Sequence, residues 1–118
     1  DLLNDWKIRV EMIDHISPPF IILKPSFIGG FRGSDNWIEL AEERGIDWWA
    51  TSALESNIGL NAIAQWTSTK DVEIPQGLGT GQLYTNNIPS PLEIRKGQIL
   101  IGDEEWALSS FIKEHIDV

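Results

Sequence analysis

Small polar residues, glycine and one lysine follow the places where apolar runs end. Lys24 closes the run Phe20–Leu23, and Thr51, Ser52 and Gly77 hold similar positions further along the chain. In β/α folds, ligands and chemistry lie at the carboxyl ends of the strands. A cation beside small polar groups and glycine backbone suits a small molecule that carries a carboxylate. These residues are therefore the first candidates for a binding or catalytic site.

A lysine at the end of a buried strand calls for an explanation, and two explanations stay open for Lys24. Either it acts in a functional site, or its aliphatic stem lies along the end of the strand while its ammonium reaches solvent. Glu55 also follows a predicted strand, just before a helix. For Glu55 we favour a structural role, because a carboxylate there can accept hydrogen bonds from the first N–H groups of the helix.

The elements that position these residues alternate between helix and strand. Apolar spacing predicts helices ending at Ile16, at Arg44 and at Thr67, and strands over residues 20–24, 47–51 and 72–79. The strand starts are spaced by roughly the 30 residues of a βαβ unit. Such alternation is typical of a parallel sheet with crossover helices, so the predicted fold class is α/β.

Periodicity also predicts which side chains are buried. In the first helix we expect Arg9 to lie outside the core and four apolar residues to face it: Ile8, Met12, Ile13 and Ile16. The continuous apolar run of the first strand predicts burial on both faces.

Three glycines precede the predicted start of the second helix. Gly29, Gly30 and Gly33 predict a loop, after which the helix begins at Ser34 or Asp35.

After Gly81 the pattern changes. Residues 92–95 and 98–101 flank a Lys-Gly pair, which predicts a hairpin. Asp103 is the expected cap of a last helix, with Leu108, Phe111 and Ile112 facing inward.

Composition excludes several classes. The chain has 118 residues, 42% hydrophobic and 23% charged, as expected for a globular domain. A net charge of −9 argues against a nucleic-acid partner, since phosphate binding relies on lysine and arginine. No apolar run approaches the roughly 20 residues that span a membrane. The absence of cysteine fits a reducing compartment, and we expect a cytoplasmic protein.

Other motifs are weaker. The glycines of segment 77–81 are spaced as in a dinucleotide-binding loop. The sequence that follows does not predict the helix whose N-terminus would bind the pyrophosphate. Gly30 and Gly33 match the two-glycine loop of an RNA-binding module, but the acidic net charge of the chain argues against RNA binding. His15 and His115 read as surface residues near helix ends. No serine lies in a nucleophile-elbow sequence.

Three segments together resemble one family. Leu23-Lys-Pro-Ser-Phe-Ile-Gly-Gly30, the run from Thr51 to Leu60 and Pro75-Gln-Gly-Leu-Gly-Thr80 are similar, in sequence and spacing, to the o-succinylbenzoate synthases of the enolase superfamily. The resemblance covers about residues 1–101. It implies about strands 6–8, the C-terminal part of a (β/α)₇β TIM-like barrel. Residues 1–84 would form this portion, and residues 85–118 a C-terminal tail with a hairpin and a helix. This tail could pack on a capping domain, but the resemblance does not place the final helix.

The resemblance also implies roles for single residues. Lys24 matches a catalytic lysine whose charge stabilises an enediolate-like anion and whose ammonium can stack on the substrate ring. Four residues match positions that line the substrate pocket: Thr51, Ser52, Gly77 and Leu78. Five match positions that support the loops: Ser26, Gly29, Gly30, Glu55 and Ser56.

Family members are Mg²⁺-dependent dehydratases of menaquinone biosynthesis that act on a small carboxylate substrate. The metal ligands come from the third to fifth strands and the proton-abstracting lysine from the second, so we expect no metal ligand and no bound Mg²⁺ in these 118 residues. The chain, which begins without methionine, is expected to be an inactive fragment. Its uncovered barrel face would pair with the missing N-terminal half or with another copy.

Two alternatives stay open. An N-succinylamino acid racemase or a dipeptide epimerase shares the barrel and the sixth-strand lysine. From a different class, the chain could be a non-catalytic half-barrel that only self-associates.

Overall fold

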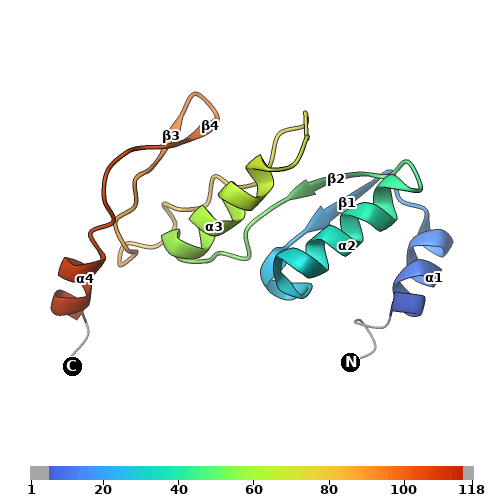
Figure 1. The fold of residues 1–118 in the computed structure, drawn as a ribbon, viewed down its shortest axis with the longest axis horizontal. Coiled ribbons are helices and arrows are strands. Elements are labelled where there is room, and N and C mark those ends of the chain that lie inside the picture. Colours follow the sequence, from blue (N-terminus) through green and yellow to red (C-terminus); the bar gives the residue numbers. More distant parts are fainter. Residues whose placement is uncertain (1–5, 116–118) are drawn as a thin grey trace. The chain divides into compact units, whose positions relative to one another are not determined.

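The computed structural model describes residues 6–115, and the chain divides into two compact units (Figure 1). The first comprises Asp1–Ala53 and Val72–Gln76, and the second comprises Leu54–Asp71 and Gly77–Val118. The division at residue 84 that the sequence suggested stays a prediction.

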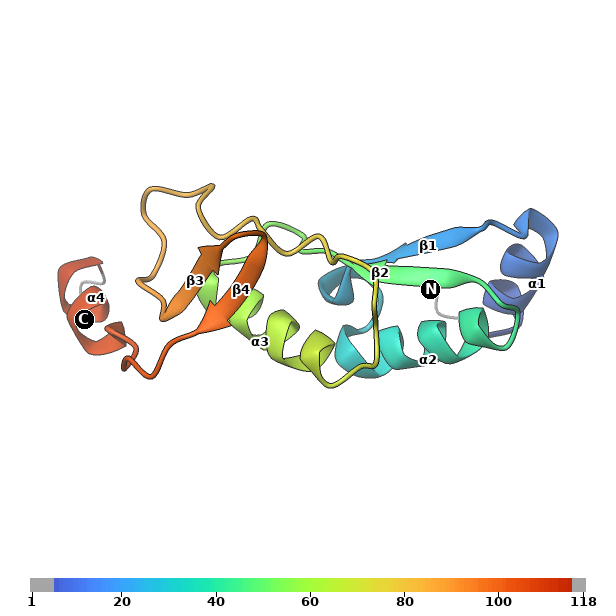
Figure 2. The same ribbon diagram turned by 90° about the horizontal axis from the view of Figure 1, so that it is seen from above.

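The first unit is built on two parallel strands. Its elements are α1 (Trp6–Ile16), β1 (Phe20–Leu23), the 3₁₀ turn η2 (Pro25–Phe27), α2 (Gly30–Glu42) and β2 (Asp47–Ala50). β1 and β2 pair in register from Phe20 with Asp47 to Leu23 with Ala50. Figure 2 shows the strands side by side with α2 running along them. The predicted mixture of helix and strand is therefore confirmed, and so is the parallel pairing of these first two strands.

One face of this strand pair is covered. Leu23, Trp48 and Ala50 are buried, and the indole Nε1 of Trp48 donates a hydrogen bond to Glu42 in α2. The neighbouring core consists of residues from α1, α2 and the following turn: Ile13, Leu40, Ala41 and Ile46.

The opposite face of β1 is open. Phe20 is 46% exposed and Ile22 is 55% exposed. The half-buried ring of Trp49 lies 5.8 Å from that of Phe20. The expectation that β1 is buried on both faces is wrong for this structure, because the helices of the first unit pack on the other side of the strands.

The glycine segment shortens the loop before α2. The helix begins at Gly30 rather than at Ser34 or Asp35. Gly29 adopts a left-handed conformation with φ 95° and its carbonyl accepts the N–H of Gly33. At Gly33 a Cβ would lie 1.9 Å from the carbonyl oxygen of Ile28, so the chain can turn into the helix only with glycine there.

Two details of α1 differ from the expected pattern. Arg9 is buried, 7% exposed, and its guanidinium lies 5.3 Å from the ring centroid of Trp37 in α2. Met12 and Ile16 are 42% and 62% exposed, so only Ile13 of the expected stripe is buried in the core. The contact between Arg9 and Trp37 explains the difference, because it places the long stem of an arginine against the neighbouring helix.

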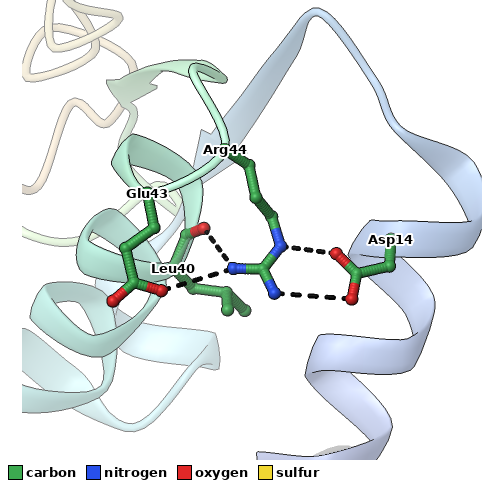
Figure 3. Close-up of polar contacts among 4 residues, drawn as sticks. All are labelled: Asp14, Leu40, Glu43 and Arg44. Carbon is green, nitrogen blue, oxygen red and sulfur yellow. Dashed lines mark hydrogen bonds and ion pairs between the residues drawn. The ribbon is translucent and has the colours of Figure 1, made fainter.

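An ion pair also joins α1 to the end of α2. Arg44 donates hydrogen bonds to the Asp14 carboxylate and to the carbonyl oxygen of Leu40 (Figure 3). Gly45 follows with φ 65° and donates to the carbonyl of Glu42. The glycine end of this helix is as predicted.

The second unit contains α3 (Asn57–Ser68), the hairpin strands β3 (Leu92–Arg95) and β4 (Gln98–Ile101), and α4 (Leu108–His115). β3 and β4 are antiparallel, and the turn residues between them both have positive φ, as the sequence predicts. Its core consists of residues from α3, the segment before the hairpin and the hairpin itself: Leu60, Ile63 and Leu78, with Ala64, Leu92 and Ile99 packed against them.

One predicted strand is wrong, and the predicted last helix is present but begins later than expected. Residues 72–79 form no strand, and only Gly77 makes an isolated bridge. Pro75 lacks an N–H for a ladder, and the neighbouring Gln76 hydrogen-bonds through its side chain. The last helix begins at Leu108 rather than after Asp103. Leu108 and Ile112 are 39% and 36% exposed, so neither of these two residues is buried, and the side chain of Phe111 lies outside the described part of the structure.

Of the helices described between residues 6 and 115, none has the length and apolarity required to cross a bilayer.

Candidate functional site

Lys24 and Thr51 lie at the same end of two paired strands. Leu23 and Ala50 are register partners, and the residue after each is Lys24 and Thr51 respectively. The N–H of Thr51 donates to the carbonyl of Leu23 at 2.9 Å, so the pairing continues one residue beyond the strands. The structure thus brings together two residues that are 27 positions apart, as the sequence predicts for parallel strands.

Lys24 is exposed and has an extended backbone, with φ −115° and ψ 93°. Its carbonyl accepts the N–H of Phe27 and so starts the turn η2, while Pro25 is buried beneath. Among the ion pairs found in residues 6–115, none involves its ammonium. Both predicted roles therefore stay open on geometry, since an exposed cation can meet a ligand or solvent.

Alternation along the strands separates Thr51 from Ser52. Thr51 is half-buried and follows Trp49 on the open side of the sheet. Ser52 is only 4% exposed. A ligand on the open side would therefore meet Thr51 more readily than the Ser52 hydroxyl.

The supporting loop after Lys24 is compact. Ser26 lies exposed in η2, and Gly29 and Gly30 have φ of 95° and 68°. The Ser34 hydroxyl donates to the carbonyl of Gly30 at 2.8 Å. These contacts fix the path from Lys24 into α2.

Glu55 and Ser56 precede α3. Ser56 is the N-cap by its backbone, yet its side chain makes no capping hydrogen bond. Glu55 is half-buried, and a Cβ built on Gly59 would lie 2.7 Å from the Cβ of Glu55. Its stem therefore packs on the first turn of the helix.

Asn87 is a helix-capping residue that sequence reasoning missed. Its Oδ1 accepts the N–H of Asn57 at 2.8 Å, and its Nδ2 donates to the carbonyl of Gly81. The amide of Asn57 in turn donates to the carbonyl of Ile88. Because the partners are 30 residues apart in sequence, no local pattern reveals this cap.

Gly77 and Leu78 belong to the second unit. Gly77 is half-buried, and Leu78 is 5% exposed within the core formed with Leu60 and Ile63. The side chain of Leu78 is therefore occupied by core packing, and only its backbone N–H and carbonyl remain as possible contacts for a ligand.

A separate cavity of about 340 Å³ lies in the second unit. It is lined by residues of α3, the following loop and the hairpin: Asn57, Leu60, Gly81, Gln82, Ser90, Leu92, Glu93, Ile94 and Ile99. The cavity includes none of the residues predicted for the site.

Within residues 6–115, no three side chains of His, Cys, Asp or Glu come close enough together to hold a metal ion. We therefore assign no metal ligand to the described part of the chain.

Comparison with known proteins bears on these observations. A protein of Desulfotalea psychrophila (strain LSv54 / DSM 12343), described as o-succinylbenzoate synthase, is 63% identical over 89 residues, which is 75% of this chain. The chain is similar to a segment of o-succinylbenzoate synthase. It spans only 24% of that relative's length. No protein-family model matches.

A solved structure agrees. The crystal structure of MenC from Desulfotalea psychrophila LSv54 matches with a TM-score of 0.76 at 60% identity, over 79% of this chain and 26% of that one. The resemblance found in the sequence is therefore confirmed. The mixed helix and strand fold of this chain matches that of a segment of the MenC structure.

Proposed function

We propose that this chain works as a segment of an o-succinylbenzoate synthase, which dehydrates 2-succinyl-6-hydroxy-2,4-cyclohexadiene-1-carboxylate to o-succinylbenzoate. The observation that carries the proposal is the 63% identity to an o-succinylbenzoate synthase over 89 residues. An identity this high over most of the chain favours the same activity over the racemase and epimerase alternatives.

The proposed place of the chain in the enzyme is the C-terminal part of a (β/α)₇β barrel. β1 and β2 would be its sixth and seventh strands, and residues 72–79 would occupy the place of the eighth. The open face with Phe20 and Ile22 supports this proposal, because strands that face a barrel interior need other strands to cover them. We propose that the rest of the enzyme, or a second copy, covers this face.

Lys24 is the proposed catalytic residue. An exposed ammonium at the strand end can approach an anionic intermediate and stabilise its charge in a site closed to water. Thr51 and Ser52, with the backbone of Gly77 and Leu78, are proposed to line the substrate pocket. The loop residues Ser26, Gly29, Gly30, Glu55 and Ser56 are proposed to hold these groups in place.

The resemblance implies Mg²⁺ in the complete enzyme, where the metal would stabilise the negative charge that develops on the substrate carboxylate. The described residues do not fit a metal site, since they bring no three potential ligands together. We therefore derive no step through the metal, and we propose that this chain is inactive by itself. The lack of cysteine supports a cytoplasmic location.

The test uses a grafted enzyme, in which residues 1–101 of this chain replace the equivalent segment of the Desulfotalea o-succinylbenzoate synthase. We expect the graft to consume the diene substrate with Mg²⁺, measured as loss of its ultraviolet absorbance. The isolated chain is the matched control and should show no turnover.

A graft that unfolds cooperatively but leaves the diene unchanged contradicts the proposal. Faster racemisation of N-succinylamino acids than dehydration would support the racemase alternative instead. If the graft does not unfold cooperatively, segments 6–53 and 54–101 are exchanged separately. Loss of dehydration in either folded half-graft again contradicts the proposal.

A further inference from the structure

One edge of β2 pairs with β1, and at the other edge a backbone N–H is hydrogen-bonded by the side chain of Gln76. The N–H groups of Asp47 and Thr51 donate to the carbonyls of Pro19 and Leu23, on the side of β1. Because successive residues of a strand direct their backbone groups to opposite edges, Ala50 directs its N–H away from β1. That N–H donates to the side-chain Oε1 of Gln76 at 2.7 Å.

Gln76 is held at both ends of its amide. Its Nε2 donates to the carbonyl of Ile74 at 2.9 Å, so Oε1 is oriented toward Ala50. The Gln76 side chain thus supplies the acceptor that a neighbouring strand would supply through its backbone. Ala50 is fully buried, and an N–H left unpaired there would be costly.

We propose that Gln76 is a positioning residue for the substrate pocket. Ala50 directly precedes Thr51 and Ser52, so fixing its N–H fixes the backbone on which both residues are placed. This inference rests on the proposed function, because it assigns Thr51 and Ser52 to the pocket. Gln76 touches neither substrate nor reacting atoms in this account, and acts through the end of β2.

The test compares Gln76→Met and Gln76→Glu in the grafted enzyme. Methionine keeps the volume and removes the acceptor, whereas glutamate keeps an acceptor for Ala50 and loses the donor to Ile74. We expect Gln76→Met to raise KM about tenfold with little change in kcat, since a misplaced pocket wall weakens ground state and transition state alike. Gln76→Glu should retain a KM closer to that of the unsubstituted graft.

Gln65→Met is the matched control. Gln65 lies exposed on α3, and its side-chain Nε2 donates a hydrogen bond to Oδ1 of Asn61 at 3.2 Å. This variant should leave KM unchanged. In addition, hydrogen exchange of the Ala50 amide should accelerate in Gln76→Met and stay slow in the control, which reports the hydrogen bond without reference to activity.

The outcomes separate the two claims. An active graft whose KM is unchanged by Gln76→Met overturns the positioning role, as do equal KM increases in Gln76→Met and Gln76→Glu. If kcat and the folded fraction fall equally while KM is unchanged, Gln76 has a merely structural role, and the proposed positioning role is again overturned. A folded but inactive graft refutes the proposed function instead. In that case the exchange rate of Ala50 still shows whether the hydrogen bond exists.

Discussion

The Arg44 guanidinium binds both oxygens of the Asp14 carboxylate. Nε donates to Oδ1 and Nη2 to Oδ2, while Nη1 donates to the carbonyl of Leu40 at 3.0 Å (Figure 3). The hydrogen bond from Arg44 lowers the pKa of the Asp14 carboxyl, and the same bond raises the pKa of Arg44. This ion pair therefore joins α1 to the turn that follows α2, and it does so only while Asp14 is ionised.

Stability should consequently depend on pH through Asp14. A carboxyl whose pKa is lower in the folded than in the unfolded state stabilises the fold at pH values above its unfolded pKa. We expect Asp14→Asn to lower the urea midpoint of the grafted enzyme at pH 7. The difference in urea midpoint from the unsubstituted protein should narrow as the pH falls below about 4, the pKa of the unfolded carboxyl, and on through the lower pKa of the folded state. Glu11→Gln, which weakens an exposed pair with Lys7, is the control. A gap that is constant with pH contradicts this account.

Gly33 is predicted to tolerate no side chain. A Cβ there would lie 1.9 Å from the backbone oxygen of Ile28, which cannot rotate away as a side chain could. We expect Gly33→Ala to destabilise the protein by roughly 1–3 kcal/mol, as overpacking does. Gly79→Ala is the matched control, because a Cβ at Gly79 meets no atom within 4 Å. Equal unfolding midpoints for the two variants would show that the turn before α2 is less tightly packed than described.

Arg9 should stabilise the first unit through Trp37. The guanidinium lies 5.3 Å from the ring centroid, and Arg9 is buried. We expect Arg9→Met, which keeps an apolar stem, to cost about 2 kcal/mol, the scale of a desolvated cation–π contact. A double-mutant cycle with Trp37→Leu should recover most of that loss as coupling. Additive effects of the two substitutions would assign the burial of Arg9 to other contacts.

Local patterns predicted much of this fold. The helix α1 ends at Ile16 as expected, and the turn of Lys96 and Gly97 fixes the register of the hairpin. The site ends of β1 and β2 were also predictable, because apolar runs separated by one helix imply parallel strands. Their pairing places Lys24 and Thr51 at one edge.

Some of the incorrect predictions involve contacts between residues distant in the sequence, and one depends on a local backbone conformation. Nothing near Arg9 in the sequence indicates that Trp37 will receive its guanidinium. The segment around Gln76 has the composition of a strand, but its hydrogen bond to Ala50 runs through a side chain, which periodicity does not detect. The early start of α2 depends on the left-handed conformation of Gly29, which glycine permits but does not require.

The measurement that tests the central claim most directly is kcat/KM for the diene substrate in the grafted enzyme, with Lys24→Ala beside Lys7→Ala. Both variants lose one exposed cation, but only Lys24 follows a strand end. We predict that Lys24→Ala lowers kcat/KM at least about a hundredfold, the scale of removing one group that stabilises a transition-state charge, while Lys7→Ala stays within about threefold. Equal kcat/KM values for Lys24→Ala and the unsubstituted graft would contradict the assignment of this lysine to the active site.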